Sequence, residues 1–438
     1  MIKKILNQLL ARHNRAVGTV LILQVTSLLL SLAITLLISN LWGPVGYGVY
    51  AYAFSWALLL GNYAGLGMDQ ASLRLIPEYL TRQELHYVRG FLKIAQRFVL
   101  IASLLLLVCA FCFSLILDFP TQTEVRNGMW LGLLSVPVIT LINLRAAWLR
   151  SLQQPVWSQL PDKLVRPALL LVFLLTAWAI GAAAISPEHL VVFALISTGI
   201  ALVLAVWRSS LLISKAIPPV APSFKTSAWL RLGLSLLLIS GAYYLLAQMP
   251  LLLLGIFHDA RETGLFAVAY RLSDIEGYVL YALNVVLAPT ISHLYTSGER
   301  QQLQRTVTAA LWAGFILAAP LMAVCLLAPH WVLHFFGNAF PEAAPVLVVL
   351  TLGQLVTFVM GPVGYLLTMT GHQRVALWIL AAAAVLSLVL GLAWIPAHGA
   401  RGAAWAVAAT SALLSVSMAL AVRKYTGINA TLFAWANP

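Results

Sequence analysis

Charge and cysteine are both scarce in this chain of 438 residues. Charged residues make up 9% of it and apolar residues 61%, against about 25% and about 45–50% in a typical soluble domain. With a mean hydropathy of +0.93, the chain has too few polar groups to cover a water-facing surface, which excludes a string of soluble domains. The 3 cysteines lie in apolar runs. Cys109 and Cys112 have the C-x-x-C spacing but no polar neighbours for thiolate or metal chemistry, so packing is the favoured role.

Enzyme motifs are also missing. The chain has no G-x-x-x-x-G-K-[ST] to hold ATP phosphates, no G-x-S-x-G and no H-E-x-x-H. Gly43–Gly48, the first loop between apolar runs, carries no carboxylate that could hold the metal ion of a membrane glycosyltransferase. We therefore expect no enzyme, no cofactor and no metal site.

Long apolar runs dominate the chain instead. A helix needs about 20 mostly apolar residues to cross a bilayer. Twelve segments meet this requirement: 17–41, 49–69, 95–117, 129–149, 164–184, 189–207, 233–257, 266–290, 307–328, 345–368, 374–396 and 402–422. The sequence predicts an all-α polytopic membrane protein with about twelve transmembrane helices and no cleavable signal peptide.

Basic residues alternate between the loops in a way that predicts orientation. With the N-terminus inside, the cytoplasmic ends and loops hold 22 of the 26 Lys and Arg residues, and the outside loops hold three. This bias predicts that both termini, including the tail 423–438, are cytoplasmic, and it explains the basic composition without nucleic acid. Residues 1–16 carry apolar side chains at helical spacing on one face and polar, mostly basic side chains on the opposite face. This pattern predicts an interfacial amphipathic helix.

The spans fall into two sets of six. Residues 17–207 and 233–422 form the predicted halves, and 208–232, which contains a Pro-rich stretch, forms the predicted cytoplasmic linker. GVYAYAF at 48–54 matches GLFAVAY at 264–270, an offset of 216 residues. Six spans per half would place both copies the same way up, an arrangement that duplicated transporters use.

Three charges lie inside the eighth predicted span. From the outer surface, Arg271 would be roughly 7–8 Å deep and Glu276 about 15 Å deep. Such charges are expensive in hydrocarbon and should face a protein interior or a wet cavity. Arg271 and Asp274 are spaced to neutralise each other, although Arg271 is also a candidate phosphate contact. Glu276 is a candidate for proton or cation coupling, with packing against another polar group as the alternative.

Other polar residues are weaker candidates. Asp69 and Arg74, at the end of the second span, could form a cytoplasmic gate or headgroup contact, or simply a solvated helix end. The remaining polar side chains within spans could line a hydrophilic path or make interhelical hydrogen bonds: Gln24, Asn62, Asn143, Gln248, Asn284 and Gln354.

Several motifs, taken in order, give the chain a family resemblance. They are LWGPVGYGVY at 41–50, GLGMD at 65–69 with Arg74, GLFAVAYRL at 264–272, LAPTIS at 287–292, FGNAFPEAAP at 336–345 and GPVGYLLTMTGHQR at 361–374. Their order and spacing resemble bacterial polysaccharide-biosynthesis and O-antigen flippases, within the multidrug/oligosaccharidyl-lipid/polysaccharide exporter superfamily.

The resemblance implies two six-helix lobes around a central cavity. It also implies a substrate, a lipid-linked oligosaccharide of the undecaprenyl pyrophosphate type. The glycan would move from the cytoplasmic to the outer leaflet of the bacterial inner membrane during lipopolysaccharide biosynthesis, by alternating access and with proton or sodium coupling left open. Arg271, and less clearly Arg74, match positions that could engage the pyrophosphate, but Asp274 and Glu276 beside Arg271 depart from a purely cationic cavity.

Two other functions stay open. A cation-coupled drug antiporter of the same superfamily would use Asp274 and Glu276 as exchange carboxylates. A non-transporting scaffold of a glycan-assembly complex would need neither. In each case we expect a bilayer and no nucleic acid as partners, with other polysaccharide-assembly membrane proteins as further candidates.

Overall fold

The structure, a computed structural model, describes residues 2–116, 120, 122–181 and 186–432, and within this part of the chain it contains helices and no strands. Helices suit a chain in lipid because each one satisfies its own backbone hydrogen bonds. The chain divides into two units, which are taken in turn below. Unit 1 comprises Met1–Trp42 and Val49–Tyr244, and unit 2 comprises Gly43–Gly48 and Leu245–Pro438.

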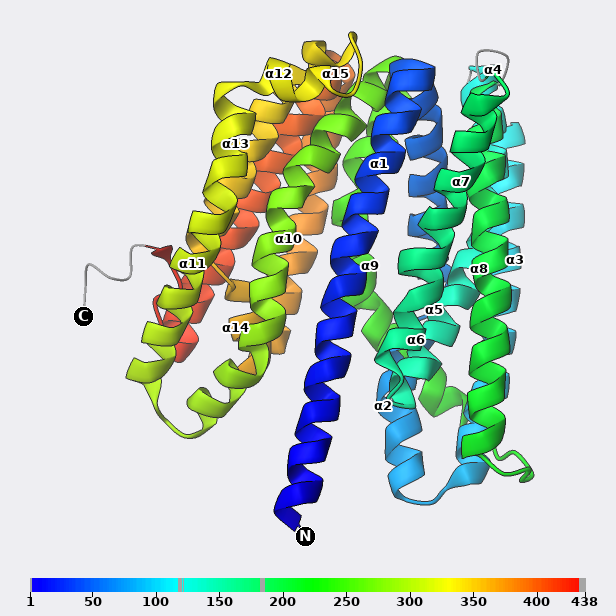
Figure 1. Cartoon of the computed structure of the whole chain (residues 1–438), viewed down its shortest axis with the longest axis vertical. Helices are drawn as coiled ribbons and strands as arrows, with labels where there is room; N and C mark the ends of the chain where they lie inside the picture. The colour runs from blue at the N-terminus through cyan, green and yellow to red at the C-terminus, as the bar shows by residue number, and fades with distance from the viewer. Residues whose placement is uncertain (1, 117–119, 121, 182–185, 433–438) are drawn as a thin grey trace. The chain divides into compact units, whose positions relative to one another are not determined.

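Unit 1 contains most of the first nine helices, whose course can be followed from blue to green in Figure 1. Helices α2, α3 and α8 pack on α5, which is therefore central to the unit. The elements are α1 (Ile2–Ala64), α2 (Met68–Thr81), α3 (Leu85–Ile116), α4 (Thr123–Leu133), α5 (Ser135–Ser151), α6 (Pro155–Leu160), the π-helix η1 (Pro161–Val165), α7 (Arg166–Ala179), α8 (Pro187–Ala216) and the first part of α9 (Thr226–Phe257).

Unit 2 contains the rest of α9 and the later helices. Here α13 packs on α10, α11 and α15, and these helices run from green to red in Figure 1. The elements are α10 (Ala260–Thr296), α11 (Arg300–Leu327), α12 (Pro329–His334), the short 3-10 helix η3 (Phe340–Ala343), α13 (Ala344–Met360), α14 (Val363–Met369) and α15 (Gln373–Thr426).

The helices confirm the predicted fold class. Among the described residues, 8 helices are long and apolar enough to cross a membrane. Two of these are broken at a glycine, α1 at Gly43 (φ 64°) and α15 at Gly399 (φ 56°), so each supplies two spans. The predicted spans 164–184 and 266–290 correspond to α6–η1–α7 and α10. Apart from residues 117 and 182–184, which lie outside the described part, about twelve spans are accounted for.

The surface of these helices also fits a lipid solvent. Large apolar side chains remain exposed along them, such as Leu105 at 61%, Val203 at 68% and Trp378 at 75%. Contiguous apolar surface of this kind is rare on monomeric soluble proteins and is expected where hydrocarbon surrounds the chain. The chain is therefore a polytopic helical membrane protein.

The two predicted terminal segments, 1–16 and 423–438, lie partly within the described residues. Residues 2–16 are helical and continue into the first span as part of α1, so the interfacial position of segment 1–16 stays a prediction. Of the predicted tail 423–438, α15 includes residues through Thr426, and residues 433–438 lie outside the described part.

The predicted linker 208–232 is mostly helical. Only residues 217–225 are non-helical, between α8 and α9, and they pack within unit 1. The Ser223 amide donates to the His86 carbonyl (3.1 Å) and the Arg89 guanidinium to the Ile217 carbonyl (3.5 Å). The connection therefore rests on the α2–α3 hairpin.

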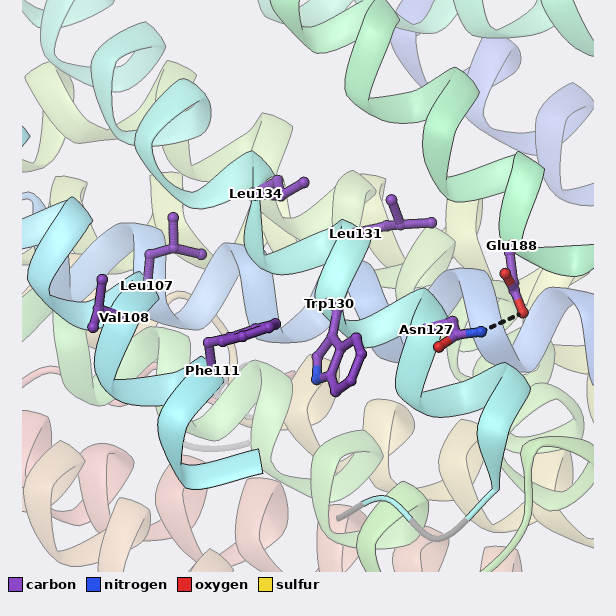
Figure 2. A pocket seen from close by; sticks show the side chains of 8 residues that line it. All are labelled: Leu107, Val108, Phe111, Asn127, Trp130, Leu131, Leu134 and Glu188. Atoms are coloured by element: carbon purple, nitrogen blue, oxygen red, sulfur yellow. Dashed lines mark hydrogen bonds between the residues drawn. The ribbon is translucent and has the colours of Figure 1, made fainter. Parts of the chain in front are cut away.

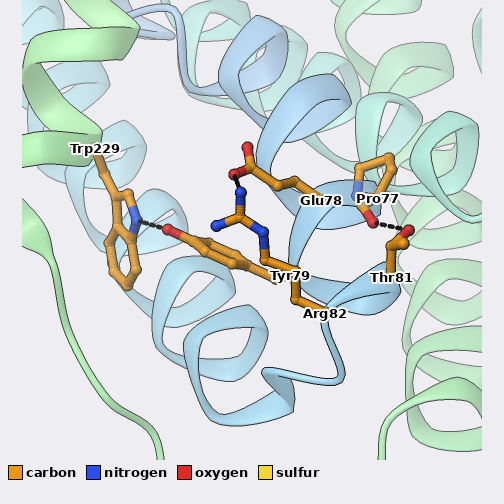
Figure 3. A network of polar contacts seen from close by, with 6 residues as sticks. All are labelled: Pro77, Glu78, Tyr79, Thr81, Arg82 and Trp229. Atoms are coloured by element: carbon orange, nitrogen blue, oxygen red, sulfur yellow. Dashed lines mark hydrogen bonds and ion pairs between the residues drawn. The ribbon is translucent and has the colours of Figure 1, made fainter.

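Trp229, just after this connection, anchors α9 to the same hairpin. Its indole Nε1 donates to the Tyr79 hydroxyl at 3.0 Å, as Figure 3 shows. Trp229 is 1% exposed, and its ring meets Phe91 edge-on at 5.5 Å. The same figure shows the Arg82–Glu78 ion pair (3.0 Å) at the end of α2. The start of α9 is thereby held in a defined position within unit 1.

Candidate functional site

A break between α1 and α2 interrupts what would otherwise be one long helix. The chain passes through Gly65, Leu66 and Gly67, with left-handed φ angles of 47° at Leu66 and 66° at Gly67. A side chain on Gly67 would overlap the carbonyl of Gly233 in α9, so glycine is required there. A leucine in the left-handed region is uncommon and strained, and such strain concentrates at functional sites.

A small polar cavity adjoins this break, and we call it the break site. It is lined by Gly61, Asn62, Gly65, Asp69, Val99, Thr140, Asn143 and Leu144. The cavity has room for one water-sized particle, because the volume open to the centre of such a particle is about 10 Å³. The cavity is thus far too small for a sugar or a drug.

Four polar side chains line the break site, those of Asn62, Asp69, Thr140 and Asn143. The Asn62 Oδ1 is buried and has no hydrogen-bond partner in the described part of the chain. The Asp69 Oδ2 accepts from the Gln70 amide at 3.0 Å. The Thr140 hydroxyl lies 2.6 Å from the Val136 carbonyl and 3.2 Å from the Gly61 carbonyl. The site therefore holds one carboxylate and one buried acceptor, the Asn62 Oδ1, that no described group satisfies.

More charged groups lie within electrostatic range. Asp69 interacts with Arg150, and Tyr244 with Asp69, Arg150, Asp162 and Arg166. All these residues belong to unit 1. They bring together α2, α5, α7, η1 and α9 around two carboxylates and two guanidinium groups.

Asp162 lies on the π-helix η1, two residues before the predicted start of the span at residue 164. Its carboxylate forms ion pairs with the Arg166 guanidinium at 2.9 Å and the Lys163 ammonium at 3.6 Å. These two cations offset the charge of the Asp162 carboxylate. The Arg166 guanidinium also lies over the Phe54 ring, 5.1 Å from its centre. π-Helical turns of this kind are frequent at functional sites.

The structure brings some of the predicted residues of unit 1 together. Asp69 and Asn62 share the break site with Asn143. Gln24 instead donates to the Gln159 side chain at 3.1 Å, an interhelical hydrogen bond. Arg74 is exposed, and five helical residues place it about 140° around α2 from Asp69. A gate formed by Asp69 and Arg74 as a pair stays a prediction.

In unit 2, Glu276 is buried at 0% exposure among α10, α11 and α13. The Thr351 hydroxyl donates to its Oε1 at 3.4 Å, and the Cys325 thiol lies next to the carboxyl. The Glu276 Oε2 has no hydrogen-bond partner among the described residues. The predicted packing against a polar group is therefore real but leaves one oxygen of the carboxyl unsatisfied.

The other predicted residues of unit 2 are on α9 and α10. Arg271 and Asp274 are half-buried and interact electrostatically, as their spacing predicted. Asp274 and Gln354 of α13 both border Gly277, since a Cβ on this glycine would be 3.9 Å from an oxygen of each. Gln248 is half-buried. The side chain of Asn284 lies outside what the structure describes.

Several enclosed charges of unit 1 are not among the residues that the sequence predicts. Arg150 and Arg166 belong to the predicted cytoplasmic basic residues, and Asp162 is not a predicted site residue, because all three lie near span ends. Arg145 is 8% exposed and donates to Gln96 (3.0 Å) and Ser209 (3.4 Å). The prolines at 155, 161 and 167 could have indicated an irregular helix at η1.

A larger hollow lies on the apolar side of unit 1. It measures about 550 Å³ and lies between α3, α4 and the start of α8 (Figure 2). Its walls are apolar, including Leu107, Phe111 and Trp130, with the Asn127–Glu188 hydrogen bond (3.0 Å) at one edge. This lining suits a hydrocarbon chain and offers little to a sugar.

Two known families match the chain over overlapping ranges. The family described as polysaccharide biosynthesis protein matches residues 15–295, well over half of the chain. The chain belongs to this family. A second family, MatE, matches residues 240–393, which include Asp274 and Glu276. Among the described residues, no group of three or more His, Cys, Asp or Glu side chains is suited to hold a metal ion.

Individual relatives are distant. The chain is 25% identical over 179 residues to the probable low-salt glycan biosynthesis flippase Agl15 of Haloferax volcanii, a match covering 41% of this chain and 38% of that protein.

Solved structures share the fold. An inward-facing multidrug resistance MATE family transporter of the MOP superfamily aligns with a TM-score of 0.73 at 14% identity, over 92% of this chain and 94% of that chain. The lipid II flippase MurJ, in an inward closed conformation, aligns with a TM-score of 0.71 at 14% identity, over 92% and 87%. This member of the polysaccharide biosynthesis family thus has the transporter fold of that superfamily.

Proposed function

We propose that this protein is a flippase for a lipid-linked oligosaccharide of the undecaprenyl pyrophosphate type. It would carry the glycan from the cytoplasmic to the outer leaflet of a bacterial inner membrane, for lipopolysaccharide or related surface polysaccharide. Membership of the polysaccharide biosynthesis family over residues 15–295 is the observation that carries the proposal. The name of the distant relative Agl15 and the fold shared with MurJ support it.

The physical need for such a protein is clear. Moving a glycan through hydrocarbon would strip its hydroxyls of hydrogen bonds at a cost of about 4–8 kcal/mol each on the strictest scale. Polar groups held inside spans can replace those bonds while the lipid tail stays in the bilayer. Alternating access, with both termini in the cytoplasm, is the transport scheme we propose.

Arg271 is the proposed phosphate contact. Its guanidinium is half-buried in α10 and is balanced by Asp274. An incoming pyrophosphate would compete with that carboxylate for the same cation. Glu276, one turn deeper, is the proposed coupling group for protons.

Purified protein in liposomes with a labelled lipid-linked glycan provides the test. A membrane-impermeant glycosidase reports how much glycan reaches the opposite leaflet, with and without a proton or sodium gradient. We expect protein-dependent, gradient-sensitive exposure, and weaker apparent affinity in Arg271→Ala. Arg261→Ala, outside the predicted spans, is the matched control.

A second candidate is a cation-coupled drug antiporter. The MatE match over residues 240–393 favours it specifically. Gradient-driven export of a cationic dye, with no glycan exposure, would establish it. Absence of both activities in folded protein would favour a scaffold in glycan assembly.

A further inference from the structure

We propose that the break site of unit 1 binds one dehydrated sodium ion. The ligands would be oxygens of Asp69, Asn62, Thr140 and Asn143, the polar side chains that line the cavity. Hard monovalent cations are bound by oxygen ligands, and broken membrane helices commonly supply them. Binding of the ion can be tested without transport; its use in driving transport rests on the proposed flippase function.

The size of the cavity selects the class of ligand. It holds a single water-sized particle, which excludes organic cations, sugars and phosphate. Its one carboxylate, Asp69, balances one positive charge. Divalent calcium and magnesium usually take more carboxylates or several waters, for which this cavity has no room.

The polarity of the lining indicates a cation. The Asn62 Oδ1 is a buried acceptor without a donor, and an unsatisfied buried acceptor costs about 1–3 kcal/mol. A bound cation would satisfy this oxygen, whereas an anion would be repelled by it. Orphan acceptors deserve such an explanation because most buried polar atoms in proteins are paired.

The backbone at the break also contributes negative potential, which favours a cation. The second arm of α1 ends at Ala64, and the carbonyls of Gly61 and Asn62 lie in its last turn, where a helix carries partial negative charge. The opposite effect comes from α2, whose N-terminus carries partial positive charge. Asp69 lies in the first turn of α2 and offsets that charge.

The charges around Asp69 leave room for an ion. Arg150 of α5 interacts with Asp69 only at longer range, since no salt bridge within 4 Å joins Asp69 to a described residue. Asp162 is neutralised by Arg166 and Lys163 on its own helical run. Tyr244 of α9 is the other titratable group facing this region. The Asp69 carboxylate is thus available to a small cation.

An ion at this position would join three helices. Asn62 belongs to α1, Asp69 to α2, and Thr140 and Asn143 to α5. Occupancy would tie the two sides of the break together, in addition to the backbone hydrogen bonds that already hold the strained Leu66–Gly67 segment. Sodium should therefore stabilise the folded protein by mass action.

The experiment compares thermal unfolding of the purified full-length protein in NaCl, KCl and choline chloride at constant ionic strength. We expect a saturable rise in the unfolding midpoint with sodium, and at least tenfold weaker apparent sodium affinity in Asp69→Asn. Glu78→Gln is the matched control, because it removes a carboxylate from the same helix outside the cavity. It should keep the wild-type response.

Equilibrium binding of radioactive sodium to the unmodified protein gives a readout that does not depend on how the variants fold. One bound ion per chain is expected. Equal midpoints in sodium and choline, or wild-type sodium affinity in Asp69→Asn, would overturn the proposal. A response to pH alone that disappears in Asp69→Asn would also overturn it, in favour of a proton site.

Failure of the ion site and failure of the flippase function are separable. Sodium binding without glycan movement in liposomes would leave the site intact and count against the flippase. Glycan movement with no sodium binding would support the flippase function and overturn the ion site.

Discussion

Gly48 and Gly264 lie against each other with reciprocal contacts. A Cβ on Gly48 would overlap the carbonyl of Ala260, and a Cβ on Gly264 would overlap the carbonyl of Pro44. Each contact becomes the other when 216 is added to or subtracted from the residue numbers, which is the offset between the similar segments 48–54 and 264–270. Reciprocal contacts of this kind are the signature of a local two-fold relation between equivalent segments.

This glycine contact should tolerate no side chain. We expect Gly48→Ala and Gly264→Ala each to destabilise the protein by about 1–3 kcal/mol, because the backbones would have to separate. The thermal unfolding midpoint of the purified protein is the measurement. Gly199→Ala is the control, since a Cβ there meets nothing within 4 Å and helical glycine is already unfavourable. Equal midpoints for all three variants would contradict the close contact.

The buried Arg145 should not be replaceable by lysine. Its guanidinium donates to Gln96 and Ser209 and lies over the Trp148 ring, 4.5 Å from its centre. A lysine keeps the charge but cannot reproduce the planar fork, so we expect a loss of about 1–3 kcal/mol. Chemical or thermal unfolding measures it, with the exposed Arg97→Lys as the control. An unchanged midpoint in Arg145→Lys would mean that only the charge matters.

The anchor between Tyr79 and Trp229 should hold the connection 217–225. In Tyr79→Phe the buried indole N–H loses its acceptor, which costs about 1–3 kcal/mol. Limited trypsin digestion should then cut faster at Lys225, which is exposed but packs 3.8 Å from the Tyr87 ring centre. Tyr243→Phe, at a ring that is 52% exposed, should digest like the wild type. Unchanged cleavage in Tyr79→Phe would show that other contacts hold the connection.

Replacing the buried Glu276 should separate folding from function. Glu276→Gln keeps the shape of the side chain and an oxygen for the Thr351 hydroxyl, so we expect nearly wild-type amounts of folded protein. Glu276→Ala leaves a void and an unpaired hydroxyl and should lower stability by about 2–4 kcal/mol.

Transport assays of the same variants test the coupling role. If Glu276 carries the coupled proton, the glutamine variant should lose the dependence of glycan movement on a proton gradient. Glu78→Gln, on the exposed end of α2, should keep it. A glutamine variant with gradient-dependent transport would restrict Glu276 to a structural role.

Some of the candidate site was predictable from the residues alone. A charge in an apolar run is conspicuous, so Arg271, Asp274 and Glu276 could be identified without coordinates, and the i,i+3 spacing of the first two predicted their interaction. The burial of Glu276 against Thr351 and Cys325 could not be predicted, because these partners lie 75 and 49 positions away in the chain. Arg145 and Asp162 show the converse: residues near span ends look solvated in sequence, and only packing shows which are enclosed.

By itself, the sequence determined that this protein is helical and spans a membrane about twelve times. These properties follow from local hydropathy and from the need of every backbone group in lipid for an internal partner. Only the tertiary structure decided which polar groups meet. Asn62, Asp69 and Thr140 are separated by up to 78 positions, and a break of three residues brings them to one cavity. Such a meeting depends on how helices pack and where they bend, which hydropathy does not encode.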